Sequence, residues 1–381
     1  MLTPDPFLSM ARQAKNQQRK STGARSRKRK NSGSTRTPLL RRFLIIVIVL
    51  LILAALVFSR LSPDPGGEAW KDAAYWLRKQ WSGLTDRAVE WPPKLEGRSV
   101  ESILEAQIAL SRIGLSPGSI TGSTNANTEA ALRAFQHTRS IPVTGFLDDE
   151  TIDLLRIAEP VFVDYTVTPD DLAALRPVAN TWRARAELDF LGHNSLLERF
   201  AEQSRSTPAK LTQLNPGVVF NTLRPGDRIR VPHFDPVQLP MPIRYLRIRL
   251  SAGLLDAFSD DGRLLLQFPV SIAQDRDKRP LGSLQIDQRV SYPNYTFQSS
   301  IFPEAAAREG INERLIIQPG PNNPVGTVWI GLDLPGYGIH GTPEPEQIGR
   351  TGSSGCFRLT NWDAETLLAN VRTGLPVYVE E

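Results

Sequence analysis

One cysteine and one histidine near the C-terminus are the residues of this chain best suited to catalysis. Cys356 is the only cysteine among 381 residues, and His340, one of four histidines, precedes it by sixteen positions. A free thiol is only about a few per cent thiolate at pH 7, but an imidazole that takes its proton makes it a strong nucleophile. Spacing alone does not place the two side chains in contact. The pair therefore predicts covalent acyl transfer, with an inert thiol and an ordinary histidine as the alternative.

A basic segment followed by an apolar one predicts a membrane anchor at the N-terminus. Residues 1–42 contain twelve Lys or Arg and one acidic residue, so they carry +11, and the rest of the chain carries −6 because the whole carries +5. Residues 43–59 follow, and the run from Phe43 to Phe58 has no polar side chain. As a helix that run spans about 24 Å, against a hydrocarbon core of about 30 Å. The alternative is a cleaved signal peptide, although no small-residue cleavage site is evident.

The charge distribution also predicts the topology and the compartment. Positive residues before the span favour a single pass with the N-terminus inside and the acidic body in the periplasm or another extracytoplasmic space. A basic tail on an acidic body argues against a nucleic-acid-binding domain. Cys356 would lie where cysteines are usually paired, and a lone one there cannot form an intrachain disulfide. It is therefore either reactive or buried and inert.

Between the anchor and the C-terminal region, the pattern predicts two small domains. Residues 60–98 favour a short amphipathic helix, with Trp70 and Trp81 at helical spacing, and a linker. Residues 99–157 favour three short helices, the second capped by Asn125 or Asn127. The stretches LEAQIALSRIGLSPGSITG and NTEAALRAFQHTRSIPVTGFLDDET resemble the peptidoglycan-binding domain that accompanies many cell-wall enzymes. A helical spacer that binds nothing is the alternative.

Residues 162–233 predict a strand, two helices and a second strand. The segments that carry this order are VDYTVTPDDL, SLLERFAEQSRSTPAKLTQLNPG and LRPGDRIRVP. This order is similar to a LysM module, which binds the glycan of peptidoglycan or chitin. A long insertion, Leu175–Gly192, separates the first strand from the first helix. A structural domain without a ligand is the alternative.

Residues 243–381 change to an alternation of apolar and polar residues that predicts β-strands, with Asp260-Asp261-Gly262 as a hairpin turn. One helix is expected near the end, capped by Asn361 or Asp363. The predicted fold class is thus a multidomain α+β chain. It comprises one N-terminal transmembrane helix, a three-helix domain, a small α/β LysM-like module and a mainly β domain with one C-terminal helix.

The β domain resembles the catalytic domain of L,D-transpeptidases. IHGT followed by SSGCFRLTN resembles the signature of that family, and RPLG and PGPNNPVGTVWI resemble its supporting stretches. The family usually has His directly before Gly-Cys, where this chain has Ser354. The resemblance implies these roles: Cys356 as the nucleophile, His340 as general base and acid, the Gly341 carbonyl to orient His340, the Gly355 and Cys356 amides to bind the oxyanion, and Arg358 to position the loop or substrate.

The resemblance also implies a reaction. The thiolate would attack the third residue of a peptidoglycan tetrapeptide stem and release D-Ala, and an amine would then accept the acyl group. A second stem would give a 3→3 crosslink, and a lysine of an envelope lipoprotein would be another acceptor. The alternatives are an L,D-carboxypeptidase of the same fold and a catalytically decayed wall-binding scaffold, to which Ser354 would point. No cofactor is implied, and no metal site is expected because the chain has no HxxxH or CxxC spacing.

Overall fold

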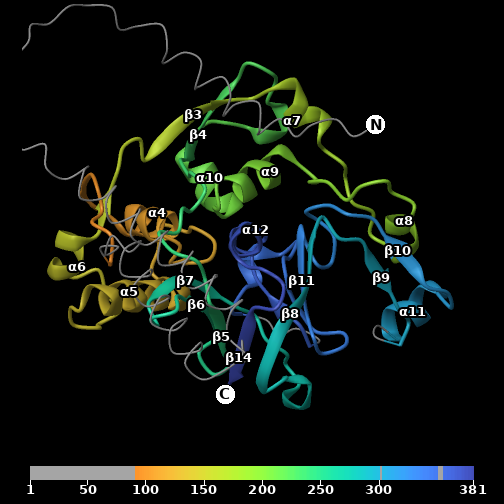
Figure 1. The fold of residues 1–381 in the computed structure, drawn as a ribbon. Coiled ribbons are helices and arrows are strands. Elements are labelled where there is room, and N and C mark those ends of the chain that lie inside the picture. The colour runs from red at the N-terminus through yellow and green to blue at the C-terminus, as the bar shows by residue number, and fades with distance from the viewer. Residues whose placement is uncertain (1–90, 301–302, 351–354) are drawn as a thin grey trace, which may run out of the picture. The chain divides into compact units, whose positions relative to one another are not determined.

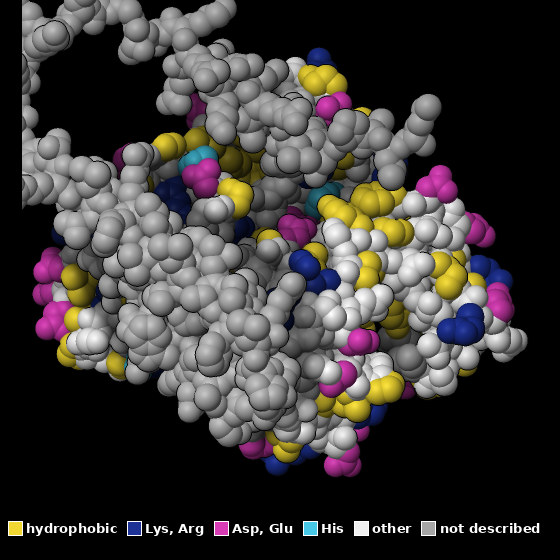
Figure 2. Space-filling view, in the orientation of Figure 1, with side chains coloured by type: hydrophobic (Ala, Val, Ile, Leu, Met, Phe, Trp, Pro, Cys, Tyr) yellow, Lys and Arg dark blue, Asp and Glu magenta, His cyan; other side chains and the backbone are white. Residues whose placement is uncertain are grey.

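The structure is a computed structural model that describes residues 91–300, 303–350 and 355–381 (Figure 1). The predicted basic tail, the anchor at 43–59 and the amphipathic helix before residue 91 lie outside the described residues. None of the helices in the described ranges is long and apolar enough to cross a membrane. On the face shown in Figure 2, basic and acidic side chains of the described residues are interspersed.

The first domain contains the three predicted helices. Its elements are β1 (Arg98–Ser99), α4 (Ile103–Arg112), α5 (Ala126–Arg139), α6 (Asp149–Leu154) and β2 (Arg156–Ile157), with β1 antiparallel to β2. Each helix begins with a side-chain cap: Ser102, Asn125 and Asp148 accept hydrogen bonds from backbone amides of the first turn. Of the two predicted caps for α5, Asn125 is therefore the actual one. A core that includes Leu110, Leu132 and Phe135 holds the helices together.

The second domain has the predicted first strand, two helices and second strand. Its elements are β3 (Phe162–Thr166), α7 (Pro169–Ala173), α8 (Trp182–Ala186), α9 (Leu196–Gln203), α10 (Pro208–Leu214), the 3₁₀ turn η1 (Phe220–Thr222) and β4 (Arg228–Pro232). The predicted helices are α9 and α10, and two short helices that were not predicted, α7 and α8, lie between β3 and α9. Strands β3 and β4 pair antiparallel, and α9 and α10 supply the core residues Phe200 and Leu211. The short helix α8 lies within the insertion Leu175–Gly192 and belongs to a different core.

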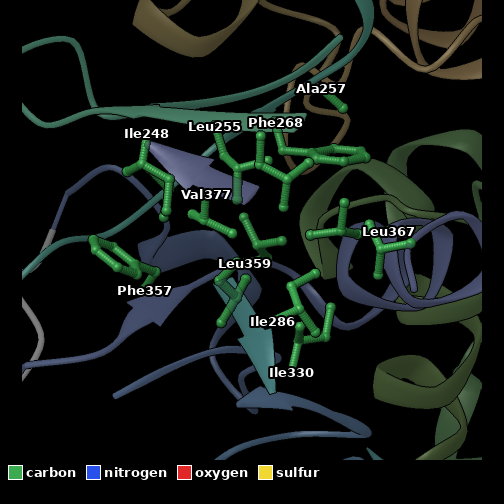
Figure 3. Packing of buried hydrophobic residues seen from close by; sticks show 14 of the residues in the cluster. Ile248, Leu255, Ala257, Phe268, Ile286, Ile330, Phe357, Leu359, Leu367 and Val377 are labelled. Carbon is green, nitrogen blue, oxygen red and sulfur yellow. The ribbon is translucent and has the colours of Figure 1, made fainter. Parts of the chain in front are cut away.

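The third domain is built on an eight-stranded mixed sheet. The strand order is β13-β12-β11-β8-β14-β5-β6-β7. The strands are β5 (Tyr245–Arg249), β6 (Leu254–Phe258), β7 (Leu264–Pro269), β8 (Gly282–Ser291), β11 (Val328–Leu332), β12 (Gly338–His340), β13 (Phe357–Arg358) and β14 (Pro376–Glu380). Two 3₁₀ turns, η2 (Arg276–Lys278) and η3 (Pro345–Gln347), lie in its loops. Side chains of Phe268 and Val377 from the sheet and of Leu367 from α12 (Asn361–Asn370) belong to one buried cluster, which Figure 3 shows.

Two details of this domain differ from the prediction. The segment between β8 and β11, residues 292–300 and 303–327, carries a hairpin of β9 (Tyr295–Phe297) and β10 (Leu315–Ile317) and a second helix, α11 (Pro303–Glu309). We call it the flap segment. Helix α11 escaped prediction because only Ala306 among its residues is buried, so it has no apolar stripe. The cap of α12 is Thr360 and neither Asn361 nor Asp363, because the Thr360 side chain accepts from the Asp363 amide.

Candidate active site

The edge of the large sheet brings Cys356 and His340 to one face. Strands β12 and β13 are parallel, with Ile339 opposite Phe357 and His340 opposite Arg358. Ile339 and Phe357 are fully buried in the core. Burial of each side chain contributes about 1.5–3 kcal/mol to the stability of the fold. Side chains alternate along a strand, so His340, Arg358 and Cys356, one residue before Phe357, all face the other side.

The imidazole of His340 is held as a neutral base. Its Nδ1 lies 2.7 Å from the carbonyl oxygen of Gly341, and because a carbonyl only accepts, Nδ1 donates and Nε2 keeps the lone pair. The ring stacks on Trp329, its neighbour across β11, at 5.8 Å between centroids and 19° between planes. Burial and the positive charge of Arg358 lower the pKa of His340 to about 4. At neutral pH the imidazole can therefore accept a proton.

The thiol of Cys356 is half-buried and protonated in the resting site. Burial raises the pKa of Cys356, and a hydrogen bond from the Gly338 backbone opposes part of that rise. The sulfur also lies 3.4 Å from the carbonyl oxygen of Gly336, to which Sγ–H donates. Both contacts are with residues in or just before β12, the strand that ends in His340. At rest the thiol is thus protonated and the imidazole is neutral.

Tyr295 is a site residue that the sequence did not indicate. It begins β9 of the flap segment, sixty-one positions before the cysteine. Burial, and secondarily the charge of Cys356, raise the pKa of Tyr295 to about 12. The phenol therefore lies within electrostatic reach of the thiol. Nothing in the local pattern of β9 separates this tyrosine from an ordinary strand residue, so only the folded chain could identify it.

Asn361 is a second site residue that the sequence missed, because its position suggested a helix cap. Its Oδ1 accepts from the amides of Thr327 at 3.2 Å and Thr342 at 3.0 Å. A Cβ added to Gly341 would lie only 2.2 Å from that oxygen, so glycine is needed for the close approach. Asn361 thereby fixes the backbone at Gly341, whose carbonyl holds His340. Thr360, directly before Asn361, is also a suitable helix cap. It was the sequence signal from which another role for Asn361 could have been predicted.

The remaining predicted site residues lie beside the thiol. Gly355 directly precedes Cys356, and among the described residues the nearest atom to a Cβ added there belongs to Tyr337, at 3.9 Å. Arg358 sits opposite His340, and burial lowers its pKa while the charge of Glu344 raises it. Ser354 lies outside the described residues. Among the described residues, no cluster of three or more His, Cys, Asp or Glu side chains could hold a metal ion.

Comparison with known proteins identifies the family. The sequence model of the L,D-transpeptidase catalytic domain (YkuD) matches residues 243–379, and that of a peptidoglycan-binding domain matches residues 99–155. An L,D-transpeptidase homologue from the ATP synthase gene region of Fuscovulum blasticum is 30% identical over 158 residues, which are 41% of this chain and 78% of the relative. The chain belongs to the L,D-transpeptidase family.

Other relatives match the same family. The YkuD protein of Bacillus licheniformis, named as an L,D-transpeptidase, is 28% identical over 48% of this chain and 92% of its own length. The Escherichia coli L,D-transpeptidase homologue ErfK/SrfK is 28% identical over 49% of this chain and 60% of its own length. The two matched family segments leave residues 156–242 between them, so the resemblance of residues 162–233 to LysM stays a prediction.

The pKa values of the pair predict an unusual pH dependence for a family member. Alkylation of Cys356 by iodoacetamide, followed by mass spectrometry, should show a midpoint above the ordinary thiol value, because burial raises the pKa. Acylation, in which His340 takes the proton, should instead keep its rate as the pH falls from 8 and lose it only near pH 4, where Nε2 becomes protonated. An acylation rate that already halves near pH 6.5 would contradict the assigned environment of His340.

Proposed function

We propose that this chain is a membrane-anchored L,D-transpeptidase that uses Cys356 to carry the acyl group of a peptidoglycan tetrapeptide stem. The observation that supports the proposal is the parallel pairing of β12 with β13, in which His340 lies opposite Arg358 and Cys356 directly precedes β13. Family membership supports the reaction class, and the neutral imidazole with its free Nε2 lone pair supports the role of base.

The chemical steps follow from that arrangement. His340 Nε2 takes the thiol proton as Sγ attacks the carbonyl carbon of the third stem residue. The amides of Gly355 and Cys356 bind the oxyanion of the tetrahedral intermediate. The C–N bond to the terminal D-Ala then breaks, and His340 returns the proton to the departing amine. The resulting thioester keeps the acyl group activated, so no nucleotide is consumed. Arg358 positions the loop or the substrate.

The acceptor decides the product. An amine of a second stem attacks the thioester carbonyl and passes its proton to His340. The C–S bond then breaks, His340 returns the proton to the sulfur of Cys356, and the product is a 3→3 crosslink. A lysine of an envelope lipoprotein would attach that protein to the wall by the same step. The domain at residues 99–157 holds the chain on peptidoglycan and so raises the effective concentration of stems at Cys356. A glycan-binding segment at 162–233 would raise that concentration further.

The test incubates the full-length chain in detergent micelles with a disaccharide-tetrapeptide and analyses the products by mass spectrometry. We expect dimers that have lost one D-Ala. Tripeptides without dimers would identify an L,D-carboxypeptidase, in which water replaces the amine. A lysine-ended lipoprotein peptide, added in a parallel reaction, reports the second acceptor. If no product forms and a carbapenem adds no mass to Cys356, the chain is a scaffold and the proposal is wrong.

The proposed location is the cytoplasmic membrane, with one span at residues 43–59, the N-terminus inside and the catalytic domain in the periplasm or its equivalent. The charge bias of +11 before the span supports this orientation. Protease added to spheroplasts should digest the body of the chain and leave an N-terminal tag protected. Digestion of the tag, or protection of the body, would overturn the topology.

A further inference from the structure

The insertion Leu175–Gly192 packs on the flap segment of the catalytic domain (Figure 1). Leu191 from the insertion and Phe297, Ile311 and Ile317 from the flap segment are buried together in one cluster. This cluster is separate from the core around Phe200 that holds the surrounding LysM-like elements. The insertion thus has its apolar partners in another domain, which explains why it interrupts the predicted module.

An aromatic chain links the insertion to the nucleophile. Trp182 of α8 lies with its ring centroid 4.6 Å from that of Phe297 and 6.2 Å from that of Tyr295. Tyr295 in turn lies close enough to Cys356 for their charges to interact. The ring contacts of Trp182 thus link the insertion to the site through the flap segment.

Backbone contacts fix the position of the insertion. The amide of Leu191 donates to the carbonyl of Pro319 at 2.8 Å, and the amide of Asn322 donates to the carbonyl of Leu191 at 3.1 Å. Between these residues, Gly320 has φ +147°, and a Cβ added there would lie 2.0 Å from the Leu191 oxygen. The approach is therefore possible only with glycine. Such paired backbone bonds define one register and resist sliding.

Polar contacts complete the docking at the other end of the insertion. The Trp182 amide donates to Glu309 Oε2 at 2.8 Å. Arg183 forms an ion pair with Glu313 at 2.8 Å, and both side chains are about half exposed. An exposed pair of this kind contributes little stability by itself. Substitutions in this pair can nevertheless weaken the contact between the insertion and the flap segment without disturbing a hydrophobic core.

We propose that residues 175–192 form a strap that fixes the flap segment, and Tyr295 with it, in the position that acylation at Cys356 needs, with Trp182 and Gly320 as positioning residues. The proposal deepens the proposed function and rests on it for the acylation readout. Without the strap, the hairpin of β9 and β10 would lose its buried partners and sample more conformations. Tyr295 would leave the thiol, which would become more exposed to water and worse at binding a peptide.

The experiment compares four variants of the full chain by two measurements at Cys356. Carbapenem acylation, followed by mass, should slow by about tenfold in Trp182→Ala and in Gly320→Ala, the scale expected for a small misplacement of reacting groups. The midpoint of iodoacetamide alkylation should fall in both, because a thiol that loses burial regains a lower pKa. Trp182→Phe, which keeps an aromatic ring, should restore acylation. Gly262→Ala, in the turn between β6 and β7, also adds a Cβ at positive φ with no atom within 4 Å, so it is the matched control and should resemble the wild type.

A charge exchange keeps the proposal testable if either core variant fails to fold. Arg183→Glu should slow acylation, and adding Glu313→Arg should restore it. If Trp182→Ala and Gly320→Ala fold and keep wild-type acylation and alkylation, the strap proposal is wrong. If those two variants do not fold, the same result in folded Arg183→Glu overturns it. If the wild type itself is not acylated, the proposed function fails, whereas the alkylation midpoints still report whether the strap controls the burial of Cys356.

Discussion

Cys356→Ala is expected to abolish acylation and cross-linking, by at least about 10⁴-fold, the scale on which removal of a covalent nucleophile acts in other enzymes. The reason is that Cys356 is the only cysteine in the chain, so no other thiol can form the thioester. The thermal melting curve should change little, because the side chain is half-buried and truncation to Ala removes a single sulfur. Mass spectrometry after exposure to a carbapenem measures the loss directly.

Cys356→Ser is the matched variant for this prediction. It keeps a hydroxyl at the same place, but an alcohol is a much weaker acid than a thiol, and a base whose pKa is near 4 cannot draw its proton efficiently. We therefore expect it to be nearly as inactive as the alanine variant. A carbapenem adduct on Cys356→Ala, at any residue, would show that the nucleophile lies elsewhere and would refute the assignment.

His340→Gln should lower the acylation rate by about 10²–10⁴-fold, the usual contribution of a general base. Glutamine can keep a hydrogen bond to the Gly341 carbonyl, but it cannot accept the thiol proton. His137→Gln is the control, because this histidine is exposed on α5, in another domain. It should acylate at the wild-type rate.

The pH profile distinguishes loss of the base from local damage. Without the imidazole, reaction needs thiolate formed by solvent, so the residual rate of His340→Gln should climb with pH toward the raised pKa of Cys356. The wild type should show no such climb between pH 6 and 8, since His340 supplies the base. A variant that stays equally slow at all pH values would instead indicate a disturbed site, and a variant as fast as wild type would remove His340 from the mechanism.

Local features of the sequence determined which residues are chemically able to react and which elements surround them. A lone cysteine, an upstream His-Gly, period-two alternation from residue 243 and the capped helices of residues 99–157 are all properties of short stretches. Patterns of nearby residues predict helices and strands. The type of each side chain determines which acid–base chemistry is available to it. The order of elements in the segment 162–233 was predictable for the same reason.

The tertiary structure decided which of these residues meet and how each is tuned. The register of β12 on β13 places the thiol and the imidazole on one face, and burial sets both pKa values. Asn361, Trp329 and Tyr295 join the site from positions that local patterns assign to a cap or to ordinary strands. The insertion Leu175–Gly192 finds its apolar partners more than a hundred residues away. Contacts of this kind depend on packing between distant segments, which periodicity and residue type do not encode locally.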